Sequence, residues 1–248
     1  MLVSTAHDDR ETAGSRRLAV ALALATLDDS PASVLDVGCG DGAILTVLAE
    51  RCPAAALTGI DPSAPALAIA AERLTPFGER VRLVACGAEE LAVTSVAPGA
   101  DRVDLALVHL NLGLWEDPLA GLEAAAGRLG PGGLLYVVDL LRPETSDEAT
   151  AFVELGQTSD EQEYLRDQLA ASFSRAEAVE LAAALSTGSI VAEARFGGLG
   201  GHPFGSRAAR ELWADAAVRG AIAGLGPPTP GDRVRAEQVL HLWVRRDR

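Results

Sequence analysis

Short apolar runs alternate with helix-length segments through the middle of the chain. The apolar runs predict five β-strands, at Ser33–Val37, Ala56–Ile60, Arg82–Cys86, Val103–His109 and Leu134–Leu140. The segments between them predict helices at Ala43–Arg51, Ala64–Leu74 and Leu119–Leu129. Pro62 and Pro118 suit first helical turns, and Gly130-Pro131-Gly132-Gly133 predicts a stop before the fifth strand. This alternation predicts a parallel sheet with helices on both faces.

The pattern changes after the fifth strand. A polar, helix-rich stretch predicts a lid insertion over residues 143–173. A core helix is expected at Ser174–Leu185, because Ser174 and Glu177 have the spacing of a reciprocal helix cap.

Two final strands are predicted at Ile190–Phe196 and Val239–Val244. A long connection, residues 197–236, separates them, and residues 1–30 predict an N-terminal helical segment. We expect residues 1–248 to form a single elaborated α/β domain.

Charge and composition exclude several classes of function. The formal net charge is −14, and all 21 basic side chains are arginine. An acidic protein lacks the clustered cations of a phosphate-binding surface, so nucleic acid is a poor substrate candidate. Without lysine, neither a pyridoxal Schiff base nor a Walker-type phosphate loop can form. The abundance of alanine and arginine is typical of a GC-rich bacterial genome.

The cysteines and the apolar runs favour a cytoplasmic protein. Three cysteines without Cys-x-x-Cys spacing predict neither a disulfide framework nor a metal site. The apolar stretch Leu18–Leu27 runs into Asp28 and Asp29, so it indicates an amphipathic or core-facing helix rather than a signal peptide. No apolar run approaches the roughly twenty residues that span a bilayer.

A glycine-rich turn follows the first predicted strand. The run Val34–Gly42 ends in Gly38, Gly40 and Gly42, the pattern of a strand that turns tightly into a helix with its backbone N–H groups facing a ligand. Asp61 ends the next strand, about twenty residues later, and is placed to accept hydrogen bonds from ribose hydroxyls. The alternative role for Asp61 is to cap the following helix.

The glycine spacing separates two classes of cofactor. A dinucleotide-binding turn has Gly-x-Gly-x-x-Gly, whereas this turn has Gly-x-Gly-x-Gly, with Ala43 where the third glycine would stand. Asp36 precedes the turn, and its carboxylate would repel a pyrophosphate but attract an ammonium group. S-adenosylmethionine carries an ammonium group and no phosphate, so it is the cofactor we expect.

With these residues the chain resembles the class I S-adenosylmethionine-dependent methyltransferases. Val34–Gly42 matches the first motif of that family, and Asp61 matches its acidic second-strand residue. The resemblance implies a doubly wound, Rossmann-like, seven-stranded and mostly parallel sheet with helical lid insertions, in which the last strand is antiparallel. It covers Val34–Leu140 by sequence, and the remainder by the order of the elements.

The resemblance also implies which residues bind the cofactor. Asp36, Gly38, Cys39 and Gly40 are expected around the methionine moiety, where Asp36 either binds the ammonium group or orders the loop. Asp61 is expected to bind the ribose, with Pro62 beside it.

A third motif, Cys86–Leu91, is expected at the adenine. There the backbone N–H of Ala88 and the carboxylate of Glu89 could meet the base. Family members usually have aspartate where this chain has Gly87, so the side-chain part of this assignment is open. Glu89 could equally be a solvated acid in a first helical turn.

Three further residues are candidates for the reaction and its substrate. His109 ends the fourth predicted strand, at the family position beside the reactive methyl group. It could contact the cofactor and act as general base, or be a structural histidine. Arg142 could bind a substrate carboxylate as a bidentate fork or form a surface ion pair. His202, in the long connection, could line the substrate pocket or lie elsewhere.

These features favour a methyltransferase that acts on an oxygen or nitrogen of a small molecule, in bacterial secondary metabolism. A homodimer is compatible with the sequence, and contacts with nucleic acid or membrane are not expected. One alternative is an enzyme of the same fold that binds S-adenosylmethionine but catalyses a cyclisation or rearrangement. Another is a noncatalytic binding protein that retains the pocket. The identity of the substrate lies beyond the sequence.

Overall fold

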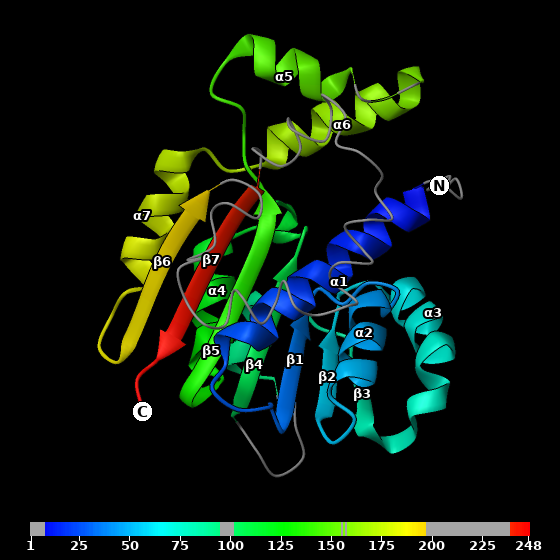
Figure 1. The fold of residues 1–248 in the computed structure, drawn as a ribbon, viewed down its shortest axis with the longest axis vertical. Helices are drawn as coiled ribbons and strands as arrows, with labels where there is room; N and C mark the ends of the chain where they lie inside the picture. The colour runs from blue at the N-terminus through cyan, green and yellow to red at the C-terminus, as the bar shows by residue number, and fades with distance from the viewer. Residues whose placement is uncertain (1–7, 95–101, 155, 157, 197–238) are drawn as a thin grey trace.

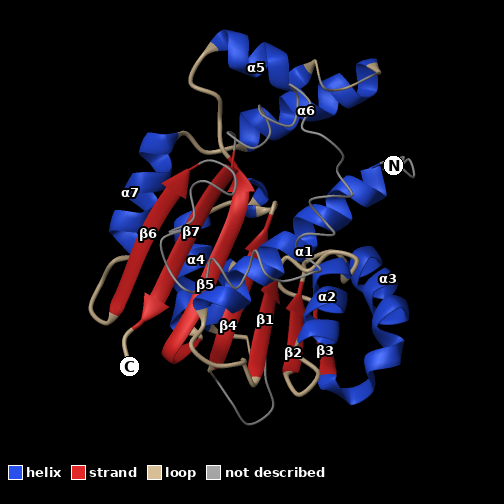
Figure 2. Ribbon diagram, viewed as in Figure 1, coloured by secondary structure: helices blue, strands red, loops and turns tan. Residues whose placement is uncertain are grey.

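A seven-stranded sheet forms the centre of the molecule (Figures 1 and 2). The computed structural model describes residues 8–94, 102–154, 156, 158–196 and 239–248. The strands are β1 (Ser33–Val37), β2 (Ala56–Ile60), β3 (Val81–Val84), β4 (Val103–His109), β5 (Leu129–Leu140), β6 (Ile190–Phe196) and β7 (Val239–Arg246). They lie in the order β3-β2-β1-β4-β5-β7-β6. The first five are parallel, and β7 runs antiparallel to β5 and β6, which confirms the expected sheet.

Helices cover both faces of this sheet (Figure 1). The α-helices are α1 (Asp8–Thr26), α2 (Ala43–Arg51), α3 (Ala64–Leu74), α4 (Pro118–Gly127), α5 (Ser146–Val153), α6 (Ser159–Ala171) and α7 (Arg175–Leu185). Three short 3-10 helices are η1 (Thr75–Arg80), η2 (Glu89–Ala92) and η3 (Leu112–Leu114). Buried residues of α1, α2 and α3 belong to one apolar cluster, whereas Leu122 of α4 and both Ala182 and Leu185 of α7 belong to a second. The sheet is therefore doubly wound.

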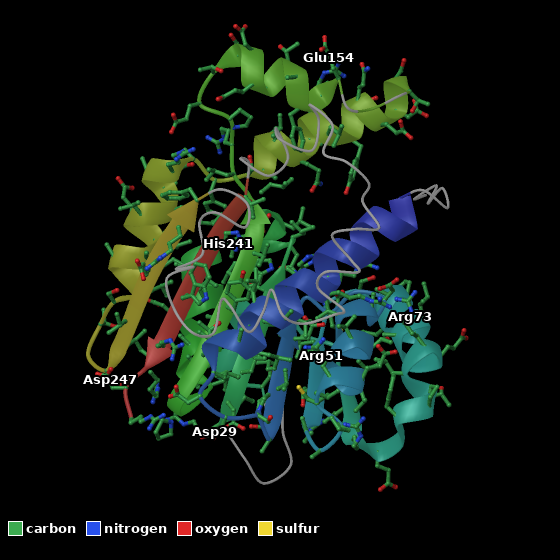
Figure 3. All side chains as sticks on the ribbon, viewed as in Figure 1. Asp29, Arg51, Arg73, Glu154, His241 and Asp247 are labelled. Carbon is green, nitrogen blue, oxygen red and sulfur yellow. The ribbon has the colours of Figure 1, made fainter. Side chains whose placement is uncertain are left out.

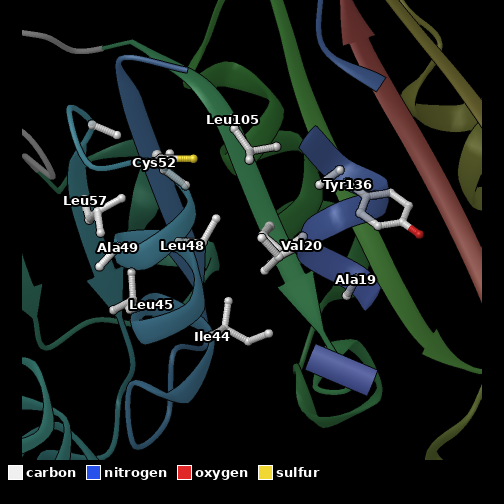
Figure 4. Close-up of a cluster of buried hydrophobic side chains, with 14 of the residues drawn as sticks. Ala19, Val20, Ile44, Leu45, Leu48, Ala49, Cys52, Leu57, Leu105 and Tyr136 are labelled. Carbon is white, nitrogen blue, oxygen red and sulfur yellow. The ribbon is translucent and has the colours of Figure 1, made fainter. Parts of the chain in front are cut away.

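The two clusters also show which way the strand residues point. In Figure 4, Val20 of α1 and Leu48 of α2 lie on the same side of the sheet as Leu105 of β4. Leu107 belongs to this cluster too, whereas its neighbours Ala106 and Val108 pack in the other. Because side chains alternate along a strand, the next residue on the α1 face is His109.

Asp36 lies on the same face as His109. Its neighbours Leu35 and Val37 pack in the second cluster, while Val34 packs in the first. In the register of the parallel pair β1 and β4, Asp36 stands beside Leu107. The alternation of the strands thus directs a carboxylate and an imidazole toward the same side of the sheet.

The lid insertion lies beyond the carboxyl ends of β4 and β5 and consists of α5 and α6 (Figure 1). Its two ends meet, because Leu141 pairs with Phe173 and the N–H of Arg142 donates to the Phe173 carbonyl at 2.7 Å. Glu154, at the end of α5, lies on the side of the lid away from the sheet (Figure 3). The chain then enters α7 through the predicted cap, in which Ser174 and Glu177 bond reciprocally.

Most element boundaries agree with the sequence predictions, but several do not. Helix α4 ends at Gly127 rather than Leu129, because Leu129 already belongs to β5. The third strand is Val81–Val84 rather than Arg82–Cys86. The predicted stop Gly130–Gly133 instead lies within β5. The register of β5 against β4 shifts between Val103 and Leu105, and this irregularity accommodates the extra residues of β5.

Of the two prolines predicted in first helical turns, Pro118 is confirmed and Pro62 is not. Pro118 begins α4 as predicted, but Pro62 lies outside α3, because Ser63 is the N-cap and Pro65 occupies the first turn. The final strand extends two residues beyond the predicted end, to Arg246. The long connection 197–236 and His202 lie outside the described residues.

Candidate functional site

The loop between β1 and α2 consists of glycines in left-handed backbone conformations. The φ angles are 75° at Gly38, 52° at Gly40 and 78° at Gly42. Residues with a Cβ rarely adopt this region, so the glycines are required for the turn. No described atom lies within 4 Å of the point where a Cβ on Gly40 would stand. The loop therefore leaves open space in which a ligand can approach the backbone closely.

Asp61 ties the end of β2 to this loop. One oxygen, Oδ2, accepts the N–H of Gly40 at 2.9 Å, and Oδ1 accepts the N–H of Ser63 at 2.8 Å. The N–H groups of Gly38 and Cys39 both donate to the Ile60 carbonyl at 2.8 Å. Each carboxylate oxygen has two acceptor sites, so Asp61 keeps capacity for further donors such as ribose hydroxyls. Asp61 can therefore accept the Ser63 N–H and still accept hydrogen bonds from a ligand.

Asp36 is a buried carboxylate beside the same loop. Its side chain is 1% exposed, and its Oδ2 has no hydrogen-bond partner among the described residues. Burial, followed by the charges of Asp61 and Asp41, raises the pKa of Asp36 to about 8. Burying a charged carboxylate without a partner costs free energy, and a cationic hydrogen-bond donor would offset that cost. The arrangement thus suits an ammonium group.

Cys39 and Pro62 complete the predicted set around the loop. The Cys39 side chain is buried, and its Sγ stands 2.8 Å from the place a Cβ on Gly59 would occupy. Burial and the nearby Asp36 raise the pKa of this thiol, which therefore stays protonated and packs as an apolar group. Pro62 is exposed between Asp61 and the helix cap.

The third motif lies after β3. Ala88 is buried, and Glu89 accepts the N–H of Asp117 at 3.3 Å through its Oε1. Glu90, rather than Glu89, bonds to the backbone of Gly87, whose N–H it accepts at 2.8 Å. The contact of Glu89 with adenine remains a prediction, as does the Ala88 backbone bond.

His109 lies at the carboxyl end of β4, next to Val138 of β5. Burial, followed by the positive charge of Arg16 on α1, lowers the pKa of His109 to about 4. The imidazole is therefore neutral at physiological pH, the state in which it can accept a proton. A low pKa also makes it a weak base, so it suits an acceptor whose proton becomes acidic during the reaction.

Arg142 is held at the base of the lid. Its guanidinium donates to the Ser172 carbonyl and lies 3.6 Å from the Glu177 carboxylate, and both side chains of this ion pair are largely exposed. These contacts join the two ends of the insertion. Binding of a substrate carboxylate by Arg142 stays a prediction. Such a carboxylate would compete with the Glu177 carboxylate for the Arg142 guanidinium.

Asn111 and Asp139 are residues of the site to which the sequence alone assigned no role. The Nδ2 of Asn111 donates to the carbonyls of Val37 and Gly38, both at 2.9 Å, and Asp139 accepts the N–H of Leu112 at 2.6 Å. Asn111 is the only asparagine in the chain and follows a strand that ends at the site. That placement was the available signal, since a side-chain amide at a strand end can bond to a neighbouring loop.

The strand order brings the candidate residues to one edge of the sheet. Glu89 follows β3, Asp61 follows β2, the glycine loop follows β1, and His109 ends β4. S-adenosylmethionine presents an adenine, a ribose and an amino acid in that same order. The open space beside Gly40, the Asp61 carboxylate and the unpaired Asp36 oxygen therefore fit this cofactor.

The described part of the chain offers neither a cluster of metal ligands nor a membrane-spanning helix. Its histidines, cysteines and acidic residues form no group of three that could hold a metal ion. None of the helices described is both long and apolar enough to cross a membrane.

Comparison with known proteins agrees with this geometry. Residues 34–133 match a family described as a methyltransferase domain. A demethylmenaquinone methyltransferase from Thermus thermophilus is 34% identical over 128 residues, which cover 52% of this chain and 54% of the relative. The chain spans between 24% and 54% of the length of the first three curated relatives it matches.

Two solved structures are similar over nearly the whole chain. The plantazolicin methyltransferase BamL, in complex with a triazolic substrate analogue and S-adenosylhomocysteine, has a TM-score of 0.80 at 24% identity. BpumL, a plantazolicin methyltransferase in complex with S-adenosylhomocysteine, has a TM-score of 0.77 at 25% identity. Each comparison covers 98% of this chain and 88% of the other. With the loop, Asp61 and the sheet order, these matches show that the chain has the fold of the class I S-adenosylmethionine-dependent methyltransferases and that residues 34–133 are similar to a methyltransferase domain.

Proposed function

We propose that this protein transfers a methyl group from S-adenosylmethionine to an oxygen or nitrogen atom of a small molecule. The observation that carries the proposal is the glycine loop, which is fixed to Asp61 and lies beside the buried, unpaired Asp36 oxygen. Together they offer acceptors for ribose hydroxyls and for an ammonium group.

The cofactor supplies an activated methyl group when it is bound. The protein must therefore orient the acceptor, exclude water and, for some acceptors, remove a proton. His109 is the proposed base, because its neutral imidazole ends β4 on the α1 face of the sheet. The lid of α5 and α6 lies over the same edge of the sheet and is proposed to exclude water (Figure 1).

The small-molecule acceptor is supported by charge and by the named relatives. A net charge of −14 disfavours a nucleic acid substrate. The relatives include methyltransferases named for demethylmenaquinone, trans-aconitate and plantazolicin. A place in bacterial natural-product biosynthesis, in the cytoplasm, is part of this proposal. So is a substrate contact by Arg142 or by His202, the latter outside the described residues.

Replacing Asp61 tests the ribose site. Asp61→Ala should weaken S-adenosylhomocysteine binding about tenfold or more, because charge-assisted hydrogen bonds to two hydroxyls are lost. Titration calorimetry measures this affinity. Asp41→Ala is the matched control, since Asp41 lies in the same loop but is paired with Arg73 at 2.6 Å. Equal affinities for Asp61→Ala and the wild type would place the ribose elsewhere.

The pKa of Asp36 predicts that cofactor binding releases a proton. In the free protein this pKa is about 8, so at pH 6.5 most Asp36 side chains are protonated. An ammonium group favours the carboxylate and lowers its pKa, so about one proton should leave for each S-adenosylhomocysteine bound. Calorimetry at pH 6.5 in buffers of different ionisation enthalpy counts these protons. Asp36→Asn should release none, and proton release that persists in this variant would assign it to another group.

His109→Ala tests the proposed base. With the true acceptor, turnover should fall about a hundredfold while S-adenosylhomocysteine affinity is largely kept. Because the pKa of His109 is about 4, its protonation should not reduce the wild-type rate between pH 8 and pH 5. A variant with nearly normal turnover would contradict the role.

The same assay separates methyl transfer from the alternative reactions. Methyl transfer forms one S-adenosylhomocysteine for each product molecule, which chromatography of the reaction mixture measures. Product that requires the cofactor but forms without S-adenosylhomocysteine would indicate a cyclisation or rearrangement instead.

A further inference from the structure

Asn111 bonds to the backbone of the glycine loop from the β4 side. Its Nδ2 donates to the carbonyls of Val37 and Gly38, at 2.9 Å each. The opposite orientation of the amide would place its oxygen against two carbonyl oxygens, so the contacts themselves fix which atom is the donor. The partners are 74 and 73 residues away in the sequence, so this contact joins two distant segments.

The Asn111 side chain also explains why residue 38 has no side chain. A Cβ on Gly38 would stand 2.0 Å from the Asn111 Nδ2, which is far inside van der Waals contact. The left-handed φ of Gly38 is the second requirement for glycine. The amide thus fills the space beside Gly38 and bonds to its carbonyl at the same time.

The turn that carries Asn111 is itself held on two sides. On one side, Asp139 of β5 accepts the N–H of Leu112 at 2.6 Å. On the other, Gly113 packs against α6 so closely that a Cβ there would stand 2.1 Å from the Ala171 carbonyl oxygen. Asn111 therefore extends from a fixed turn rather than from a free loop.

The loop has different partners on its two sides. On the β2 side it is bonded to Asp61, the proposed ribose ligand, and on the β4 side to Asn111. If the adenine lies beyond β3 and the ribose at β2, the amino acid part of the cofactor must extend toward β1 and β4. Asn111 stands on that side of the loop.

We infer that Asn111 is a positioning residue, which holds the Val37–Gly38 backbone in the conformation that binds the amino acid part of the cofactor. This inference rests on the proposed function. Asn111 acts through the loop, so it should matter for ligands that carry the amino acid and not for ligands that lack it. A loop that must first be ordered binds more weakly, since ordering costs free energy at the moment of binding.

Two ligands distinguish this role from a general structural one. S-adenosylhomocysteine carries the amino acid, whereas 5′-methylthioadenosine has the same adenosine and a thioether but no amino acid. Titration calorimetry with the purified full chain should show that Asn111→Ala binds S-adenosylhomocysteine about tenfold more weakly, because two backbone hydrogen bonds are lost. Its affinity for 5′-methylthioadenosine should stay within about twofold of the wild-type value.

Two further variants complete the experiment. Gln168→Ala is the matched control, because Gln168 is an amide on α6 that lines the same small cavity as Asn111. It should keep both affinities. Asn111→Ser retains one donor and should fall between Asn111→Ala and the wild type, and it serves in place of Asn111→Ala should that variant fail to fold.

The outcomes are distinct. An equal loss for both ligands, or no loss for either, would overturn the role of Asn111. A wild-type protein that binds neither ligand would contradict the proposed function and the inference with it. A wild type that binds both, with a loss confined to S-adenosylhomocysteine in Asn111→Ala, supports both.

Discussion

The candidate site depends on contacts that fix the conformation of the β1–α2 loop, because the residues of the loop do not fix it by themselves. Three glycines in left-handed conformations give the β1–α2 loop its shape, but glycine has the largest conformational freedom to lose on folding. The loop is fixed by partners on both neighbouring strands, through Asp61 on the β2 side and Asn111 on the β4 side. Because both bond to the backbone, the amides and the open space beside Gly40 are set before a ligand arrives.

This arrangement concentrates negative charge where a cation is expected. Asp36 is buried, and Asp61 and Asp41 lie near enough to raise its pKa further. The free protein therefore keeps Asp36 mostly protonated below pH 8, since a buried carboxylate without a partner has lost its hydration. A bound ammonium group would favour the charged carboxylate and compensate for that lost hydration.

Much of the fold was predictable from the sequence because its signals are local. β1, β2 and β4 have the predicted bounds, since each is a short and mostly apolar run. The N-terminal cap of α7 was also predictable, because Ser174 and Glu177 are three residues apart. β5 was predicted too short, because it begins at Leu129 and then passes through Gly130–Gly133, where its register against β4 shifts, and no local pattern encodes such an irregularity.

The position of Asp36 and Asp61 beside the glycine loop was predictable, because each lies at or near the end of a predicted strand. The site was not predictable where a role depends on a contact between distant segments. Asn111 donates to the Gly38 carbonyl, 73 residues away in the sequence, and Arg142 donates to the Ser172 carbonyl, 30 residues away. No local pattern encodes such pairs.

A crystal structure of the protein with S-adenosylhomocysteine would show whether the glycine loop and its partners bind the cofactor. We expect ribose hydroxyls within hydrogen-bond distance of the Asp61 carboxylate, the amino acid beside Asp36, and the Asn111 amide still bonded to the loop. A ligand bound elsewhere, or a loop that abandons its bonds to Asn111 when the ligand binds, would contradict this expectation.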